Sequence, residues 1–188
     1  LFDEAARLSR KAGDRGGWAV SWRMKGTSLQ PDENPDGDWS TALAIANELI
    51  AYCRRDSSLE EELGDVLYDR GWCLQPNNNA GTKDWGLPVA AYEEAERIHS
   101  KLSTRWSRLQ RSNSTYSLGW CYQPGHHPAG SWPRAIRHYE QAATSFAEIG
   151  EDEGLADAYR QLGYALIALG AGDSWARATV ALQDAADV

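Results

Sequence analysis

Apolar residues recur along the chain at the three- and four-residue spacing of an α-helix, in segments separated by short polar stretches that contain Gly or Pro. In four of these segments the apolar stripe includes a glycine. The pattern predicts about nine helices, at residues 2–12, 17–30, 39–55, 58–75, 87–102, 105–123, 133–149, 152–169 and 174–186. We therefore expect an all-α fold.

The segments also repeat in sequence. RGWCLQPNNNAGTKDW at 70–85 returns as LGWCYQPGHHPAGSW at 118–132, and more faintly as KGTSLQPDENPDGDW at 25–39 and LGYALIALGAGDSW at 162–175. The glycines Gly26, Gly71, Gly119 and Gly163 mark a period of about 46 residues. Each copy reads as two helices. The second helix carries a small residue that we expect to face the glycine: Ala42, Pro88, Ala135 and Ala178.

This arrangement resembles the tetratricopeptide repeat (TPR), a helix-turn-helix unit. The match is best over 158–185, with three extra residues at the turn, where eight residues are in register: Tyr159, Leu162, Gly163, Leu166, Gly170, Ala178, Leu182 and Ala185. Lys25 and Arg70 stand where the family has Leu, and Pro88 where it has Ala. The resemblance implies a right-handed α-α superhelix over 1–188, with a partial repeat at 1–13 and repeats at about 14–57, 58–104, 105–150 and 151–188.

The segment FAEIGEDEGLADAYRQLGYALIALG, 146–170, is further similar to the repeat arrays attached to bacterial STAND-type signalling ATPases. Residues 12–26 match 149–163, so the chain opens halfway through a unit, and we expect it to be a fragment of a longer protein. It contains no GxxxxGK[ST] phosphate-binding motif. Any nucleotide chemistry of such a protein is therefore expected outside this segment.

The stretch PDENPDGDW, 31–39, looks like the start of a calcium loop. Such a loop needs a bidentate acid at its twelfth position, where Leu43 stands. The corresponding turns of the other copies offer no set of carboxylates, so we interpret the stretch as a turn insertion. His126 and His127, in the third turn, lack a third ligand and are expected to face solvent. We expect neither a metal nor a cofactor.

The composition of the chain disfavours several classes of function. Asp and Glu number 27 against 19 Lys and Arg, without a basic run, which disfavours a nucleic-acid partner. No apolar run approaches the roughly 20 residues of a membrane span, so we expect a cytoplasmic protein without membrane contact. Cys53, Cys73 and Cys121 are expected to be buried reduced thiols. No Ser or Cys nucleophile stands in a recognisable setting, so an enzyme is not expected.

The candidate site comes from the resemblance, because first helices line the concave face of TPR proteins. Counted from each glycine, that face holds residues spaced i, i+4, i+7, and two copies present the same Tyr, Trp, Gln trio. Such side chains suit recognition of a protein or peptide partner. The predicted ligand-binding residues are Arg23, Gln30, Tyr68, Trp72, Gln75, Tyr116, Trp120, Gln123, Arg160 and Tyr164.

Two alternatives stay open. The turn insertions could fold over, so that Trp72 and Trp120 pack on Trp85 and Trp132 as part of the core. The groove could also close on a small-molecule effector of a signalling or transcription regulator instead of a peptide. The tryptophans beside the turns are assigned to structure: Trp39, Trp85, Trp132 and Trp175.

Overall fold

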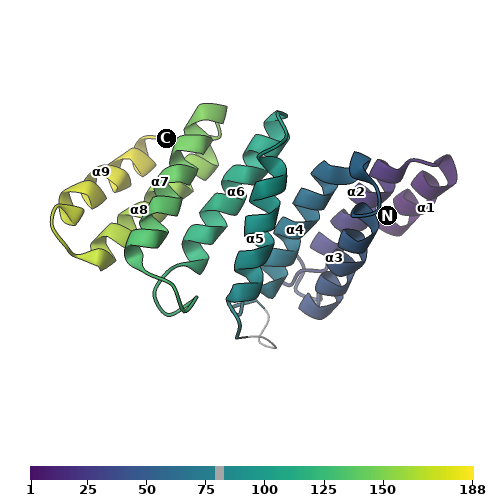
Figure 1. Cartoon of the computed structure of the whole chain (residues 1–188), viewed down its shortest axis with the longest axis horizontal. Helices are drawn as coiled ribbons and strands as arrows, with labels where there is room; N and C mark the ends of the chain where they lie inside the picture. The colour runs from purple at the N-terminus through teal and green to yellow at the C-terminus, as the bar shows by residue number, and fades with distance from the viewer. Residues whose placement is uncertain (79–82) are drawn as a thin grey trace. The chain divides into compact units, whose positions relative to one another are not determined.

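The computed structural model describes residues 1–78 and 83–188, and within these ranges it contains nine α-helices, one short 3-10 helix and no strand (Figure 1). The all-α prediction is confirmed. The elements are α1 (Phe2–Ala12), α2 (Arg15–Thr27), α3 (Trp39–Cys53), η1 (Ser57–Leu59), α4 (Glu60–Leu74), α5 (Gly86–His99), α6 (Arg105–Cys121), α7 (Trp132–Ile149), α8 (Asp152–Leu169) and α9 (Ser174–Asp187). None of the helices in these ranges is long and apolar enough to cross a membrane.

The chain divides into two compact units, Leu1–Ile98 and His99–Val188. In unit 1, α1 packs on α2, α2 on α3 and α3 on α4. In unit 2, α6 packs on α7, α7 on α8 and α8 on α9. Packing between consecutive helices is what a repeat-like array of helical hairpins requires.

Helix ends follow local capping chemistry. The Asp14 carboxylate accepts a hydrogen bond of 2.8 Å from the Gly17 amide, so α2 begins two residues earlier than predicted. Asp38 caps α3 in the same way, through the amides of Ser40 and Thr41. Helices α1, α7 and α8 end at glycines with positive φ, namely Gly13, Gly150 and Gly170.

Each helical hairpin is closed by a large side chain that lies against the repeated glycine. A Cβ atom on Gly71 would lie 2.7 Å from Cε1 of Tyr92, and one on Gly119 would lie 2.7 Å from Cε1 of Tyr139. Such a distance is too short for a real side chain, so both positions need glycine. Ile45 and Leu182 fill the equivalent space over Gly26 and Gly163. At Gly71, Gly119 and Gly163 the residue that faces the glycine is therefore one helical turn beyond the predicted small residue, whereas at Gly26 the Ala42 carbonyl oxygen is also within 3.9 Å of the Cβ position.

The small residues are nevertheless buried next to these contacts: Ala42, Pro88, Ala135 and Ala178. The four tryptophans beside the turns differ from one another. Trp85 is buried, and Trp39 and Trp132 are half-buried. Trp175 is 61% exposed at the start of α9, so burial does not support the structural role that was predicted for it.

Candidate functional site

The glutamines of the repeated trio point into the protein. Gln75 Nε2 donates a hydrogen bond of 2.8 Å to the Tyr92 hydroxyl, and Gln123 Nε2 donates one of 2.9 Å to the Tyr139 hydroxyl. These are the same tyrosines that lie on Gly71 and Gly119. We call each set of glycine, tyrosine and glutamine a Gly-Tyr-Gln lock. The expectation that Gln75 faces an open groove is corrected, because the residue is only 3% exposed.

The glutamines point inward, contrary to the expectation, because the helices end before them. Spacing of i, i+7 puts two residues on one face only while the backbone stays helical. Helix α4 ends at Leu74, and Gln75 has the extended dihedrals φ −60 and ψ 131. Helix α6 ends at Cys121, two residues before Gln123. The glutamines therefore turn inward instead of extending the helical face.

Gln30 also lies in the interior, at 5% exposure. Its Nε2 is 3.6 Å from Sγ of Cys73, which is a weak hydrogen bond within unit 1. Like the other two glutamines it follows a helix end, because α2 ends at Thr27. The expectation that Gln30 lies on an open helical face is corrected for the same physical reason.

The tyrosines of the trio are half-buried and pack beside the locks. The Tyr68 ring centroid is 5.5 Å from that of Tyr92, and the Tyr116 ring centroid is 5.6 Å from that of Tyr139. These tilted pairs suit aromatic packing. Tyr68 and Tyr116 thus pack against the rings of Tyr92 and Tyr139 from the first helix of each hairpin.

The tryptophans of the trio are half-buried and contact turn residues. Trp72 Nε1 donates a 2.7 Å hydrogen bond to Oδ2 of Asp32, in the turn between α2 and α3. The Trp120 ring centroid is 5.5 Å from that of His126, in the turn that follows its own helix. Turn residues thus contact both rings, Asp32 from the turn of the preceding repeat and His126 from the turn that follows Trp120.

The turns that follow α2, α4 and α6 share one geometry. A side-chain nitrogen bonds the carbonyl of the residue six positions earlier: Asn34 to Ser28 at 3.2 Å, Asn78 to Trp72 at 3.0 Å, and His126 Nδ1 to Trp120 at 2.9 Å. His126 is thus half-buried in the turn, which corrects the expectation that it faces solvent. Residues 79–82 of the second turn lie outside the described residues. The calcium-like stretch is one of these turns, and its Asp32 is engaged by Trp72.

Arg23 and Arg160 have different surroundings, although the sequence treats them alike. The Arg23 guanidinium is 3.5 Å from a carboxylate oxygen of Asp65 and 3.5 Å from one of Asp69, between α2 and α4. Its side chain is 18% exposed. Arg160, on α8, is 49% exposed and pairs with Asp157 at 2.5 Å. Tyr164, one turn further along α8, is 54% exposed. Of the predicted site, Arg160 and Tyr164 are therefore the exposed members.

The aspartates around Arg23 lie in an unfavourable electrostatic setting. Burial raises the pKa of Asp69 to about 6, and the neighbouring Asp65 adds to that rise, while Arg23 opposes it. Asp69 Oδ2 is buried without a hydrogen-bond partner among the described residues. This cluster fills the space between helices and offers no open cation to a ligand.

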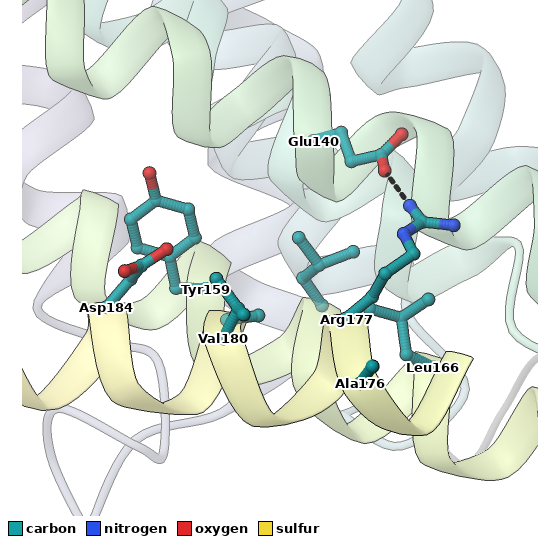
Figure 2. Close-up of a pocket in the computed structure, with 9 residues that line it drawn as sticks. Glu140, Tyr159, Leu166, Ala176, Arg177, Val180 and Asp184 are labelled. Atoms are coloured by element: carbon teal, nitrogen blue, oxygen red, sulfur yellow. Dashed lines mark hydrogen bonds and ion pairs between the residues drawn. The ribbon is translucent and has the colours of Figure 1, made fainter. Parts of the chain in front are cut away.

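Unit 2 contains a pocket of about 340 Å³ that was not predicted from the sequence. It lies among α7, α8 and α9 and is lined by Glu140, Tyr159, Leu162, Leu166, Ala176, Arg177, Val180, Ala181 and Asp184 (Figure 2). We call it the α7–α9 pocket. The sequence of α9 contains a pattern that could have indicated the pocket, because four of the lining residues recur at helical spacing on one face: Arg177, Val180, Ala181 and Asp184. Val180 stands out there because it is apolar and 60% exposed.

The α7–α9 pocket has an apolar middle and polar ends. Leu162 and Leu166 are buried on the α8 side, and Val180 projects from α9. In Figure 2 the Glu140–Arg177 ion pair, which joins α7 to α9, lies at one end of the pocket, and Tyr159 and Asp184 lie toward the other. Asp184 has no ion-pair partner among the described residues. The pocket can therefore take an apolar group with a cation beside it.

The described residues show no cluster that could hold a metal ion, and their cysteines are protonated and buried. No group of three or more His, Cys, Asp or Glu side chains in the ranges 1–78 and 83–188 could hold a metal ion. The three cysteines are buried and not disulfide-bonded, as predicted. Burial raises the thiol pKa of Cys53 to about 11, and those of Cys73 and Cys121 to about 12. Neutral thiols of this kind are poor nucleophiles.

No model of a known protein family matches the sequence, and no curated protein matches it either. The function of the chain must therefore be inferred from the geometry of its residues, above all from the α7–α9 pocket and the exposed side chains beside it.

Proposed function

We propose that this chain is a protein- or peptide-binding module of a larger regulatory protein, and that the α7–α9 pocket binds an apolar side chain of the partner. The observation that carries this proposal is an open pocket of about 340 Å³ with an apolar middle. Ligand sites typically measure about 300–1,000 Å³, so this pocket suits one or two aliphatic side chains. Burying them would contribute about 25 cal/mol per Å² of apolar surface.

The polar ends of the pocket define the partner further. Arg177 and Asp184 are seven residues apart on α9, which is about 10 Å along a helix. Arg177 is already paired with Glu140, whereas the Asp184 carboxylate is open to a basic group. We expect a partner segment with an aliphatic residue and, within about 10 Å of it, a Lys or Arg.

The resemblance to the TPR family adds to this proposal. Helical hairpins closed on a glycine are the units that the family stacks into a right-handed superhelix, and the family's arrays bind peptides. The STAND-like character of 146–170 would place the module in a signalling protein. Arg160 and Tyr164, exposed on α8, would then extend the binding surface beyond the pocket.

A second candidate is a small-molecule sensor, which the size of the pocket favours. A thermal-shift screen separates the two. A ligand that binds the folded state raises its stability by RT ln(1 + [L]/Kd), so a preformed metabolite site should respond at modest concentrations. A peptide module should respond to selected peptides instead.

A peptide-display selection with one designed variant tests the proposal. Val180→Glu puts a charge into the pocket, and because Val180 is exposed, the fold should be retained. The matched control is Thr179→Glu, which adds the same charge to the same helix turn outside the pocket. Peptides selected on the full chain should bind Val180→Glu at least tenfold more weakly and Thr179→Glu equally well. Equal binding to both variants would contradict the proposed site.

A further inference from the structure

Arg70 occupies a position that the two copies of the repeat in unit 2 fill with a buried leucine. The residue before the repeated glycine is Leu118 or Leu162 in unit 2, and these side chains are 1% and 7% exposed. In unit 1 the position holds Lys25 or Arg70. A cation at a position of this kind needs a partner, because burial without one is costly.

The two cations of unit 1 are satisfied differently. Lys25 Nζ lies 2.6 Å from Asp3 Oδ1 and 4.5 Å from the centre of the Trp22 ring, so its charge is balanced. Arg70 Nε donates a 2.9 Å hydrogen bond to Oδ1 of Asn47, which is neutral. Within the described residues Arg70 has no carboxylate partner. Its remaining guanidinium hydrogens are therefore open to an anion.

A groove of about 310 Å³ lies at Arg70, between α3 and α4. We call it the Arg54–Arg70 groove. It is lined by Asn47, Ile50, Ala51, Arg54, Leu67 and Arg70. Ile50 and Leu67 are 6% and 1% exposed and form an apolar floor. The groove belongs to unit 1, whereas the α7–α9 pocket belongs to unit 2.

The polar groups of the groove are nearly all donors. Arg54 and Arg70 carry only N–H groups, and the one side-chain acceptor, Asn47 Oδ1, is engaged by Arg70. Arg54 Nη2 lies 3.0 Å from both carboxylate oxygens of Glu94, so Arg54 has an anionic partner, which it shares with Arg97. The unbalanced charge is thus that of Arg70, a single positive charge on a guanidinium that suits a planar carboxylate.

We propose that the Arg54–Arg70 groove binds a carboxylate that carries a short aliphatic group. Arg70 pairs with the carboxylate, the Asn47 amide nitrogen supplies a further donor, and the aliphatic group rests on Ile50 and Leu67. The single unbalanced charge favours a monoanion over a phosphate dianion. A free aliphatic carboxylic acid and the C-terminal leucine of a peptide share this chemistry.

Calorimetric titration of the full 188-residue chain tests the proposal. The probes are 4-methylpentanoate, N-acetylleucine, its amide, a short peptide ending in leucine, and inorganic phosphate. Both carboxylates should bind, and the amide should bind at least tenfold more weakly. A peptide that binds at least tenfold more tightly than 4-methylpentanoate identifies a peptide C-terminus as the source. Equal affinities identify a free acid.

The decisive variant is Arg70→Leu, which restores the residue that the unit 2 copies bury and is expected to fold. It should weaken N-acetylleucine binding at least tenfold, and Arg70→Gln, which keeps a polar side chain, should do the same. The matched control is Arg108→Leu, which removes an exposed arginine of unit 2 and should change the affinity less than twofold.

The proposal is overturned if no carboxylate binds, if phosphate binds in preference, or if the Arg70 variants bind as well as the control. Val180→Glu should leave N-acetylleucine binding unchanged, because Val180 lies in the other unit. Failure of the groove and failure of the α7–α9 pocket are therefore separate results.

Discussion

The two units use the same lock and different polar interiors. Unit 1 has the Gly71–Tyr92–Gln75 lock and unit 2 the Gly119–Tyr139–Gln123 lock, with matching geometry. Unit 1 places an ionic cluster between its helices, whereas α6 of unit 2 buries hydroxyl groups that bond carbonyls of the same helix, as Ser114 does with Gln110. Repeated residues thus build the framework. Arg70 in the groove and Val180 in the pocket, by contrast, stand at positions where the copies differ.

The largest effect is expected from the locks themselves. Tyr92 and Tyr139 are both 0% exposed, and truncating a buried ring to alanine typically costs about 3–5 kcal/mol. We expect Tyr92→Ala and Tyr139→Ala to lose similar amounts of stability in urea unfolding followed by tryptophan fluorescence. A loss below about 1 kcal/mol in one variant alone would show that the locks are not equivalent.

The ionic cluster should give unit 1 a distinctive pH dependence. Because the pKa of Asp69 is raised to about 6 from its usual 3.8, the folded state binds a proton more tightly than the unfolded state. The protonated Asp69 therefore contributes stability that is fully present below about pH 4 and is lost as the pH rises through 6. The free energy of unfolding should fall by about 2–3 kcal/mol over this range.

Asp69→Asn should remove this dependence and raise stability at pH 7 by about 2 kcal/mol, because the amide stays neutral. Urea unfolding between pH 4 and pH 7 measures it. Hydrogen exchange in α4 reports the stability of unit 1, and hydrogen exchange in α7 reports that of unit 2. If the stability of the wild-type unit 1 rises between pH 4 and pH 7, the assignment is contradicted.

Unit 2 should respond to pH with the opposite sign and a smaller size. Burial, together with the positive charges of Arg134 and Arg137, lowers the pKa of His138 to about 4, and its ring stacks on Tyr122 at 5.4 Å. The neutral ring contributes stability that is present above about pH 6.5 and is lost as the pH falls from there through 4. We expect protection of α7 amides to fall by about 1–2 kcal/mol between pH 7 and pH 5, and His138→Gln to abolish the change.

The smallest effect concerns the turns. Asp32 and Asp36 are both exposed, but among the described residues only the Asp32 carboxylate accepts a hydrogen bond, from Trp72. Asp32→Ala should therefore cost about 1 kcal/mol, and Asp36→Ala should be nearly neutral. Calcium should leave the melting temperature of wild type unchanged. A calcium-dependent rise that is lost when both aspartates are replaced would restore the metal interpretation of this stretch.

The helices could be predicted from sequence because their apolar periodicity and caps are local. The repeated glycine also predicted a close approach, although the sequence did not reveal that Tyr92 and Tyr139 fill it. The candidate site was harder. Counting i, i+7 from Tyr68 assumes a helix through Gln75, but α4 ends one residue earlier and the amide turns inward. The α7–α9 pocket depends on three helices meeting, and the pattern on α9 predicts only one of its walls.

A pair of double-mutant cycles on the two locks tests most sharply whether the repeated glutamines belong to the framework. The first cycle combines Gln75→Leu with Tyr92→Phe, and the second combines Gln123→Leu with Tyr139→Phe. In each cycle one substitution removes the donor and the other removes the acceptor of the same hydrogen bond. We predict a coupling energy of about 0.5–1.5 kcal/mol in both cycles. We also predict that the variants bind peptides selected on the α7–α9 pocket as tightly as the wild-type chain does. Coupling near zero, together with loss of peptide binding in the glutamine variants, would return these residues to a ligand groove and contradict their structural role.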